Sequence, residues 1–495
     1  MKKLVTSKGN IFVDWLGRHT LLHGINMVCK EKDRNYIGDY HDKDFETLRN
    51  GGFNVIRLGI FWDAVEPEPG KYDEHYLSKI DELIAMAAAH DIHVFLDMHQ
   101  DLFGSQFSDG APDWATLTDG YEHVQTDLWS ESYLLSRAVQ TAFDNFWNNK
   151  PACDGVGIQD HYIHMWKHIA LRYKDNITVI GYDVMNEPFM GSGASEVLQA
   201  LLSGLAEAMP NNLALNPNDS LALWSDSSKK EELIGLLTDK TLYTNLIQGA
   251  QGSSQQFEKT SLRTFYNRIA RTIREVDQET MIFLETNYFS NAGMTSAITA
   301  IVDKNGLQDP NQAYAPHGYD ILVDTDLYEQ SCNARVEVIF EAHKQVQNKL
   351  NLPLLVGEWG CYPNASEKQL EQAAHLVQIF EKDLASDTYY DFSHLYHNPI
   401  SKVIVRPYPM KAAGRILEYS YTHQNNRFHC KIQEEKSSTD TVIFVPNLES
   451  IKDVTLVPYG QGYTLEQIDG SHSGYVFLPA LGYPEIRQID FSLIQ

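Results

Sequence analysis

The chain has 495 residues, and 66 Asp and Glu residues against 40 Lys and Arg residues give it a net charge of −26. This charge disfavours binding to nucleic acid or to a bare anionic membrane surface, so neither is an expected partner. A hydrophobic content of 43% is typical of a globular protein, and no apolar run approaches the roughly 18 residues of a transmembrane segment. The length exceeds that of one ordinary core but fits a barrel with a smaller companion domain.

The cysteines and the N-terminus indicate a reducing compartment. The five cysteines are scattered and odd in number, without the spacing of metal ligands or of a disulfide framework. The chain begins Met-Lys-Lys, but Gly9, Asn10 and Asp14 interrupt the following residues before a signal-type apolar stretch can form. We therefore expect free thiols, no metal or cofactor, and a cytoplasmic location, or a secreted one if an export signal has been removed.

Short apolar runs alternate with polar loops and helix-like stretches along most of the chain. The runs occupy residues 21–28, 53–60, 93–99, 179–185, 281–286, 313–319 and 354–358, and we expect an eighth within 387–397. Amphipathic stretches such as 76–90 and 339–350 lie between them. This βα alternation predicts an α/β fold with a parallel sheet, and at this length a (β/α)8 TIM barrel rather than a doubly wound sheet.

Two connections between the predicted strands, 101–175 and 189–280, are far longer than usual. Both leave the carboxyl end of the barrel, so we expect them to wall an active site there. Within the second, four leucines recur at helical spacing: Leu198, Leu201, Leu202 and Leu205. They either face the core of their own helix or line the cleft, and the pattern alone does not separate these two interpretations.

The character of the sequence changes after about residue 400. The motif Arg406-Pro-Tyr-Pro409 interrupts the helix–strand alternation. Short alternating segments at 428–432, 441–445, 454–457 and 474–478 then indicate a small antiparallel β-sandwich. We expect residues 1–402 to form the barrel and residues 403–495 to form the sandwich domain.

Two of the apolar runs end abruptly in a glutamate. Asn186-Glu187-Pro188 follows one run, where the proline stops the strand, and Glu358 ends another, just before Trp359. Two carboxyl groups at strand ends suit glycoside hydrolysis, in which one gives a proton and the other attacks the anomeric carbon. The alternatives are a surface loop for Glu187 and a salt-bridged strand end for Glu358.

Other polar residues occupy strand positions where they suit the same chemistry. Arg57 lies inside an apolar run and, if buried, needs a carboxylate, whose pKa it would hold down; a structural ion pair elsewhere in the barrel is the alternative. His99 and Asp101 end the third run and offer donors and acceptors to sugar hydroxyls, although a packed core histidine is the simpler interpretation of His99. His317 and Tyr319 close the sixth run, where Tyr319 is placed to hydrogen-bond a nucleophile.

These strand-end residues resemble glycoside hydrolase family five, in the clan of retaining (β/α)8 glycosidases, and within it the endoglycoceramidase-like subgroup. Further motifs that carry the resemblance are Gly24-Ile-Asn26 with Lys30, Asp97-Met-His-Gln-Asp101, Phe143-x-x-Phe-Trp-Asn-Asn149, Gly181-Tyr-Asp-x-x-Asn-Glu-Pro188 and Arg406-Pro-Tyr-Pro409. The resemblance implies that Glu187 is the general acid/base and Glu358 the nucleophile. It also implies that Asn186, His99, Asp101 and Lys30 contact the first sugar.

The chain departs from this family pattern at the eighth strand. A tryptophan usually forms a platform under the first sugar there, whereas this sequence offers only Tyr389, Tyr390 and His394. We take Tyr389 as the substitute contact, and a smaller or rotated platform would change which sugar is accepted.

The resemblance implies a retaining β-glycosidase that separates a glycan from an apolar, ceramide-like aglycone, so a glycolipid is the expected substrate. An endo-β-glucanase or β-mannanase is an alternative, but it would need a long tryptophan-lined cleft and the chain has eight tryptophans. A simple β-glucosidase remains open. A non-catalytic glycan- or lipid-binding barrel is disfavoured, because both glutamates and their supporting residues are present.

Overall fold

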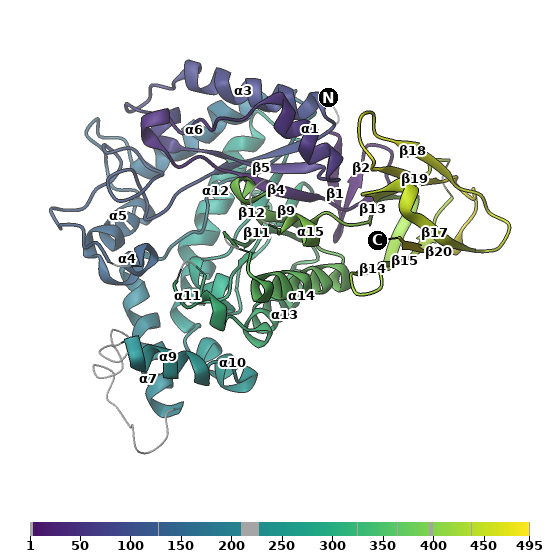
Figure 1. Cartoon of the computed structure of the whole chain (residues 1–495). Helices are drawn as coiled ribbons and strands as arrows, with labels where there is room; N and C mark the ends of the chain where they lie inside the picture. Colours follow the sequence, from purple (N-terminus) through teal and green to yellow (C-terminus); the bar gives the residue numbers. More distant parts are fainter. Residues whose placement is uncertain are drawn as a thin grey trace.

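The computed structural model describes residues 3–126, 128–208, 227–323, 325–363, 365–395, 399–436 and 438–494. Its centre is a closed barrel of parallel strands (Figure 1). The strands are β4 (His23–Met27), β5 (Val55–Ile60), β6 (His93–Met98), β7 (Val179–Asp183), β8 (Met281–Leu284), β9 (Gln312–Tyr314) with β10 (His317–Gly318), β11 (Leu355–Gly360) and β12 (Ser386–Tyr390).

The sixth strand of the barrel is interrupted around Pro316, and the two pieces close the sheet. The piece before the proline, β9, pairs with β8, and the piece after it, β10, pairs with β11. Backbone hydrogen bonds from Ala315 N–H to Leu284 O and from Gly357 N–H to Pro316 O continue the ladder across the break. Because β12 also pairs with β4, the predicted (β/α)8 barrel is confirmed, including its eighth strand.

Helices surround the barrel, and their buried faces explain why they form. In α3, Asp73 caps the first turn by accepting hydrogen bonds from the His75 and Tyr76 N–H groups, and Leu77, Ile80 and Ile84 face the core. The helices around the barrel are α1 (Asp42–Asn50), α2 (Trp62–Val65), α3 (Glu74–Ala89), α6 (Ile158–Tyr173), α12 (Arg263–Arg274), α13 (Asn333–Leu350) and α14 (Glu367–Asp383).

The barrel interior has an apolar lower layer and a polar upper layer. Alternate residues of a strand share a face, so Val55 and Arg57 both point inward, as do Phe95 and Asp97. Val55 and Phe95 belong to a buried apolar cluster that Val5 and Phe12 of the N-terminal hairpin complete. Arg57 and Asp97 therefore lie above a packed plug, toward the carboxyl ends of the strands.

The two long connections fold into helices beside the barrel. The first contains α4 (Ser132–Leu135) and α5 (Arg137–Trp147). The second contains α7 (Ala194–Ala208), α9 (Ser227–Leu236), α10 (Lys240–Gly249) and α11 (Gly252–Phe257), at the lower left of Figure 1. Helix α7 packs against both α4 and α10, so the two connections meet. Every helix in the described ranges is too short or too polar to span a lipid bilayer.

The C-terminal part is an antiparallel sandwich, reached through α15 (Ser401–Ile404). One sheet has the order β1-β2-β3-β13-β16-β19-β18 and the other the order β14-β15-β20-β17, with a shared apolar core that includes Ile416, Phe428 and Phe444. The strands are β1 (Val5–Lys8), β2 (Ile11–Asp14), β3 (His19–Thr20), β13 (Tyr408–Ala412), β14 (Gly414–Thr422), β15 (Arg427–Glu434), β16 (Thr441–Val445), β17 (Ile451–Val457), β18 (Thr464–Gln467), β19 (Gly474–Leu478) and β20 (Glu485–Leu493).

The N-terminal strands join this C-terminal sheet, because β3 pairs with β13. On the other side, Glu381 of α14 accepts hydrogen bonds from Arg406 Nε (2.9 Å) and from the Tyr421 N–H (2.9 Å). Both contacts tie the sandwich to the barrel. A domain boundary at residues 402 and 403 stays a prediction.

Candidate active site

The two glutamates that end apolar runs lie together at the carboxyl end of the barrel. Glu187 follows β7, and Glu358 lies in β11 directly beside His317 of β10. A carboxylate oxygen of Glu187, a carboxylate oxygen of Glu358 and a ring nitrogen of His317 all lie within 4.8 Å of one another. Folding therefore brings two carboxyl groups that are distant in sequence into one site.

Glu187 has an unusual backbone that several hydrogen bonds fix. Its φ of +43° lies in the left-handed region that non-glycine residues rarely adopt. Its N–H donates to Glu285 Oε2 (2.7 Å), and the preceding residue, Asn186, donates its N–H to Met98 O (3.1 Å). The Glu187 side chain accepts two hydrogen bonds on one oxygen, Oε1, from His317 Nδ1 (2.9 Å) and Asn291 Nδ2 (2.6 Å).

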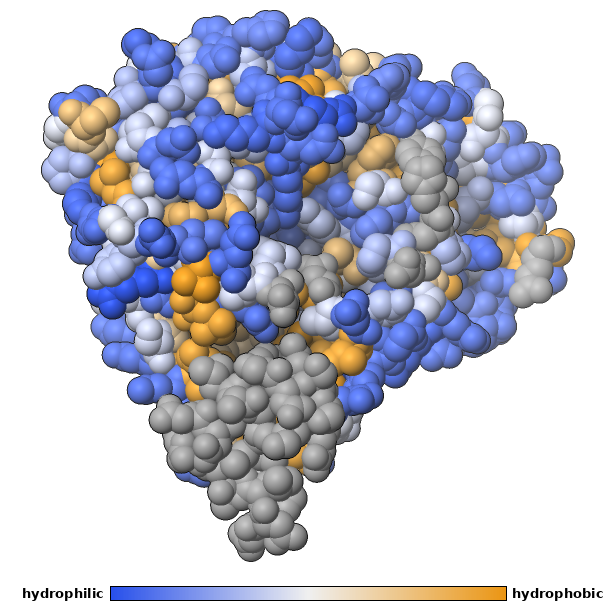
Figure 2. Space-filling view, turned by 60° about the vertical axis from the view of Figure 1, so that its left-hand side comes forward, coloured by the Kyte–Doolittle hydropathy of each residue, from blue (hydrophilic) through white to orange (hydrophobic). Residues whose placement is uncertain are grey.

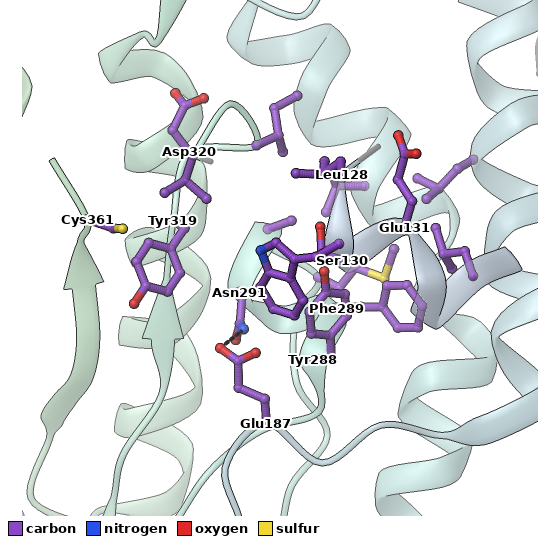
Figure 3. A pocket seen from close by; sticks show the side chains of 18 of the residues that line it. Leu128, Ser130, Glu131, Glu187, Tyr288, Phe289, Asn291, Tyr319, Asp320 and Cys361 are labelled. Carbon is purple, nitrogen blue, oxygen red and sulfur yellow. Dashed lines mark hydrogen bonds between the residues drawn. The ribbon is translucent and has the colours of Figure 1, made fainter. Parts of the chain in front are cut away.

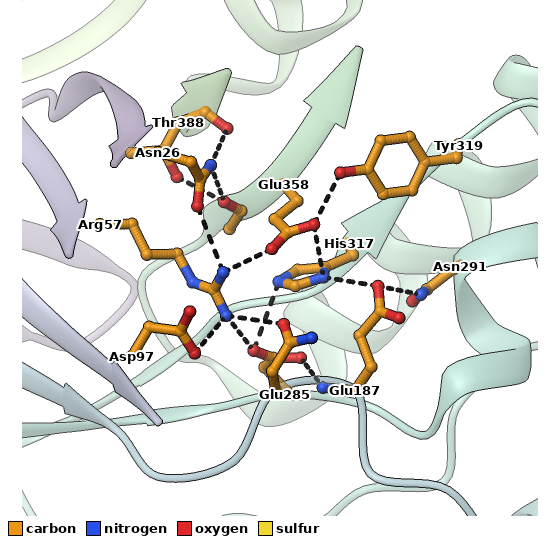
Figure 4. A network of polar contacts seen from close by, with 12 residues as sticks. Asn26, Arg57, Asp97, Glu187, Glu285, Asn291, His317, Tyr319, Glu358 and Thr388 are labelled. Carbon is orange, nitrogen blue, oxygen red and sulfur yellow. Dashed lines mark hydrogen bonds and ion pairs between the residues drawn. The ribbon is translucent and has the colours of Figure 1, made fainter. Parts of the chain in front are cut away.

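Glu358 is held by Arg57 and Tyr319 (Figure 4). Arg57 Nη1 lies 2.5 Å from Glu358 Oε1, and the Tyr319 hydroxyl donates to Glu358 Oε2 at 2.7 Å. The Arg57 side chain is fully buried. A buried guanidinium requires a carboxylate partner, and Glu358 is one of the carboxylates that pair with Arg57.

Arg57 also contacts three further carboxyl groups and two side-chain amides, of which Asn26 accepts a hydrogen bond from Nη1 on its Oδ1 (3.2 Å). Its Nε lies 2.9 Å from Asp183, and its Nη2 lies 2.9 Å from Asp97 and 2.7 Å from Glu285. The Asn186 Oδ1 accepts a hydrogen bond from the same Nη2 (2.9 Å). This network fixes the guanidinium in one orientation, and it fixes Asn186 beside Glu187.

Burial and neighbouring charges separate the pKa values of the two glutamates. Burial raises the pKa of Glu187, the negative charge of Glu358 adds to this effect, and the hydrogen bond from His317 only partly opposes it. Burial would also raise the pKa of Glu358, but the positive charges of His317 and Arg57 lower it instead. The pair is thus arranged with the proton on Glu187 and the negative charge on Glu358.

His317 bridges the acidic groups as a cation. Burial opposes its charge, yet Glu285 and Glu358 raise its pKa well above the ordinary value, helped by its hydrogen bond to Glu187. In turn, His317 and Arg57 lower the pKa of Glu285 to about 2 despite its burial. His317 therefore donates from Nδ1 to Glu187, while its Nε2 lies 3.3 Å from Glu285 Oε1.

A second polar cluster lies beside the glutamates. Lys30 Nζ lies 2.5 Å from Asp101 Oδ2, and His99 Nδ1 lies 2.7 Å from Asp97 Oδ2. Burial opposes charge on both His99 and Asp101. Asp97 nevertheless raises the pKa of His99 to about 10, and Lys30 lowers that of Asp101 to about 2. Lys30, His99, Asp101 and Asn186 all line the same pocket as the two glutamates.

Three clusters in the described part of the chain bring metal-ligand atoms close together: His99–Asp101–Asp109, Asp183–Glu285–His317 and Glu187–His317–Glu358. Each already contains a carboxylate paired with a cationic side chain. Lys30 pairs with Asp101, and Arg57 pairs with Asp183, Glu285 and Glu358. To bind a metal ion, these carboxylates would have to give up their ion pairs with Lys30 or Arg57.

The predicted sugar contact Tyr389 lies behind the pocket, whereas its neighbour Tyr390 lines the pocket. Tyr389 is fully buried, packs edge-on against Trp359 and accepts a hydrogen bond from the Tyr362 N–H (3.1 Å). Tyr390 lines the pocket, with its ring centre 5.4 Å from Lys30 Nζ. Successive residues of a strand face opposite sides, so only one of the two tyrosines can reach the site.

The pocket has a volume of about 620 Å³ and a polar and an apolar end. The polar end holds the two glutamates. Figure 3 shows Glu187 at this end, with Asn291 and Tyr319 nearby. At the apolar end, Leu198, Leu201, Leu202 and Leu205 of α7 form what we call the leucine wall. These leucines line the cleft, which decides between the two interpretations of their spacing. Residues of both long connections line the pocket, as predicted: Leu128, Trp129, Leu134 and Leu135 from the first, and Leu237, Leu246 and Ile247 besides the leucine wall from the second.

Residues 17–395 match the family described as Cellulase (glycosyl hydrolase family 5), and residues 406–469 match the Glycoside hydrolase family 5 C-terminal domain. This chain belongs to glycosyl hydrolase family 5. The first match spans the barrel up to the end of β12, and the second begins just before β13 of the sandwich.

The relatives within the family include endoglycoceramidases. The endoglycoceramidase of Cyanea nozakii is 35% identical over 208 residues, which are 36% of this chain and 40% of that protein. Endoglycoceramidase I of Rhodococcus hoagii is 23% identical over 477 residues, 93% of this chain and 82% of that protein. Among solved structures, the ganglioside GM3 complex of endo-glycoceramidase II from Rhodococcus sp. shares the fold, with a TM-score of 0.74 at 23% identity over 99% of this chain and 100% of that one.

Several residues that line the pocket or contact its glutamates in this family 5 chain were not predicted. Glu285 follows the apolar strand β8, so the pattern that identified Glu187 and Glu358 would have found it too. Asn291, Tyr288 and Trp129 lie in irregular or single-turn segments, where no periodicity marks a residue. On the face shown in Figure 2, hydrophobic residues gather in patches below the middle of a mostly hydrophilic surface.

Proposed function

We propose that this chain is a retaining β-glycosidase that cleaves the bond between a glycan and an apolar, ceramide-like aglycone. The observation that carries the proposal is a single pocket with the paired glutamates at its polar end and the leucine wall at its apolar end. Relatives named endoglycoceramidase in Cyanea nozakii and Rhodococcus hoagii support it. A glycolipid has the same division into a polar and an apolar half.

In the first step, Glu358 attacks the anomeric carbon while Glu187 protonates the departing oxygen. The bond between the anomeric carbon and the aglycone oxygen breaks, and an ester forms between that carbon and Glu358. Because Glu187 Oε1 already accepts hydrogen bonds from His317 and Asn291, the proton resides on Oε2. Oε2 is therefore the atom that acts as the acid.

In the second step, Glu187 removes a proton from water, and the water oxygen attacks the anomeric carbon from the side that the aglycone left. The ester bond between that carbon and Glu358 breaks, which releases the glycan and restores the Glu358 carboxylate. Ester formation removes the negative charge of Glu358, which lowers the pKa of Glu187 and suits its new role as a base. Two displacements give net retention. The carboxylate oxygens within 4.8 Å fit the separation of about 5–5.5 Å in retaining enzymes better than the roughly 6.5–9.5 Å of inverting ones.

The residues around the glutamates are suited to hold the first sugar. Lys30, His99 and Asp101 present donors and acceptors to hydroxyl groups, and Asn186 lies beside Glu187, with its Oδ1 fixed by Arg57. Trp129 and Tyr390 both lie near Lys30, with ring centres 5.9 Å and 5.4 Å from its Nζ. In this proposal, Tyr390 and Trp129 replace the missing tryptophan platform.

The leucine wall is suited to an acyl chain and unsuited to a further sugar. Leu198, Leu201 and Leu202 are only partly buried in the free protein, so an acyl chain would remove more apolar surface from water. A polysaccharide presents hydroxyl groups that an aliphatic wall would leave without hydrogen-bond partners. This contrast favours the lipid-linked substrate over the glucanase and mannanase alternatives.

The test is a product analysis on a panel of β-glycosides. Ceramide-linked oligosaccharides, ceramide-linked monosaccharides, soluble cellulose and mannan oligomers, and a methyl glycoside are incubated with the enzyme, and the products are identified by mass spectrometry. We expect release of an intact glycan and free ceramide. Efficient cleavage of the soluble oligomers with no cleavage of any ceramide-linked glycan would refute the proposal. The Glu187→Gln variant is the control for background activity.

A further inference from the structure

One buried carboxylate outside the pocket contacts the loop that carries Asn291. Glu258 is fully buried, does not line the pocket, and lies at the start of a π-helical segment (Glu258–Leu262) between α11 and α12. Such segments are rare and often occur at functional sites. The mechanism above assigns no task to this residue.

Glu258 holds both ends of the loop that follows β8. At the start of the loop, Glu258 Oε1 accepts hydrogen bonds from the Asn287 N–H (3.1 Å) and the Asn287 side-chain Nδ2 (2.6 Å). At its end, the same oxygen accepts from Ser296 Oγ (2.8 Å), and Oε2 accepts from the Ala297 N–H (2.5 Å). One carboxylate thus closes the 287–297 loop through four hydrogen bonds.

The middle of this loop reaches Glu187. Asn291 donates from Nδ2 to Glu187 Oε1 (2.6 Å), and its own backbone carbonyl accepts from the Tyr319 N–H (3.1 Å). Tyr288 and Phe289 of the same loop line the pocket (Figure 3), and so does Met294. A shift of the loop would therefore move the amide that fixes Glu187.

We propose that Glu258 is a positioning residue for Glu187: it clamps both ends of the 287–297 loop and thereby holds the Asn291 amide against the Glu187 carboxyl group. This inference rests on the proposed acid/base role of Glu187. Glu258 touches neither the pocket nor Glu187, so it acts through Asn291. The arrangement keeps hydrogen bonds on Glu187 Oε1 and leaves Oε2 for the proton that is transferred.

The consequence is a coupled change in rate and pH profile. The Asn291 amide stabilises the ionised form of Glu187, so its loss raises the pKa of Glu187 and moves the basic limb of the kcat/KM profile to higher pH. The groups that face Glu187 and also influence this limb are His317, Tyr319, Glu358, Asp101, Glu285 and Tyr133. These groups are unchanged in the variants below.

The test compares Glu258→Gln, Asn291→Ala and the double variant. Gln keeps the shape of Glu258 but turns an amide NH2 group toward hydrogen-bond donors of the loop. We expect each single variant to lose about tenfold in kcat/KM, the typical value of one hydrogen bond to a charged group, with the basic limb at higher pH. The double variant should match Asn291→Ala in both measurements, because the two residues act in series.

Two further variants separate positioning from general stability. Glu381→Gln removes a buried glutamate that also accepts two hydrogen bonds but lies between the barrel and the sandwich, so it should lower Tm without moving the basic limb. Ser296→Ala removes one donor to Glu258 and should move the limb in the same direction if Glu258→Gln does not fold. A basic limb that stays in place in Glu258→Gln and Ser296→Ala, or losses that add in the double variant, would overturn the inference. Persistence of the basic limb in Glu187→Gln would instead overturn the role of Glu187.

Discussion

Lengthening the aglycone by two methylene groups should raise kcat/KM roughly tenfold while the added carbons stay inside the pocket. Each methylene transferred from water to an apolar site contributes about 0.8 kcal/mol, so two contribute about 1.6 kcal/mol, and about 1.4 kcal/mol corresponds to a factor of ten. The apolar end of the pocket offers the leucine wall and Leu237, Leu246 and Ile247 for this contact.

The assay measures kcat/KM for one glycan joined to a methyl group and to alkyl chains of increasing length, each below its micelle concentration. In this series the chemistry at Glu187 and Glu358 stays the same, so the slope of log kcat/KM against chain length reports the apolar contact. We expect a steady rise and then a plateau where the chain leaves the pocket.

A variant tests whether the leucine wall causes the slope. Leu198 lines the pocket and is only partly buried, so its loss should have a smaller effect than the loss of a fully buried leucine. Leu198→Ser should reduce kcat/KM for the longest chain by roughly fivefold and leave kcat/KM for the methyl glycoside unchanged. The matched control is Leu171→Ser, because Leu171 is a 50% exposed leucine that does not line the pocket. A flat response to chain length, or equal effects of the two variants, would refute this reasoning.

Three further predictions follow from the charged network. Activity should follow a bell-shaped pH profile. It should fall on the acidic side as Glu358, whose pKa is lowered, becomes protonated, and on the basic side as Glu187, whose pKa is raised, loses its proton. The measurement is kcat/KM against pH for the parent and for Glu187→Gln, which should lose the basic limb. Glu358→Ser should lose hydrolysis yet transfer sugar from a glycosyl fluoride of inverted anomeric configuration, as detected by chromatography of the products, and unchanged hydrolysis would contradict its role. Arg57→Met should destabilise the fold by about 3–5 kcal/mol in urea unfolding, because it leaves buried carboxylates unpaired. Arg172→Met removes a partly exposed ion pair and should cost only about 1 kcal/mol.

The strand-end residues could be predicted because their signal is local. An apolar run that stops at Glu187 or Glu358 marks a buried strand and its mouth, and parallel strands bring such ends together. The eighth strand was harder to place, since Ser386–Tyr390 carries polar residues whose partners are distant in sequence. Asp387, for example, lies 3.0 Å from the His23 ring and accepts a hydrogen bond from the Trp359 indole.

The pairing of strands that are distant in sequence, and the register of those strands, could not be predicted. The choice between Tyr389 and Tyr390 depends on the register of β12 against β11, which shifts between Val356 and Trp359. The junction of β3 with β13 joins residues about 390 positions apart, and no local pattern encodes such a pairing. Asn291 likewise reaches Glu187 from a loop that Glu258 clamps at both ends, and these contacts depend on the folded barrel.

The proposed covalent role of Glu358 can be tested most directly by trapping the intermediate. A 2-deoxy-2-fluoro β-glycoside with a good leaving group slows hydrolysis of the ester, so the sugar stays attached and intact-protein mass spectrometry followed by peptide mapping locates it. We predict one added fluorosugar per chain, carried by the peptide that contains Glu358, and no adduct in Glu358→Ser. An adduct on another residue, or turnover of the unmodified glycoside with inverted product in NMR, would contradict the central claim.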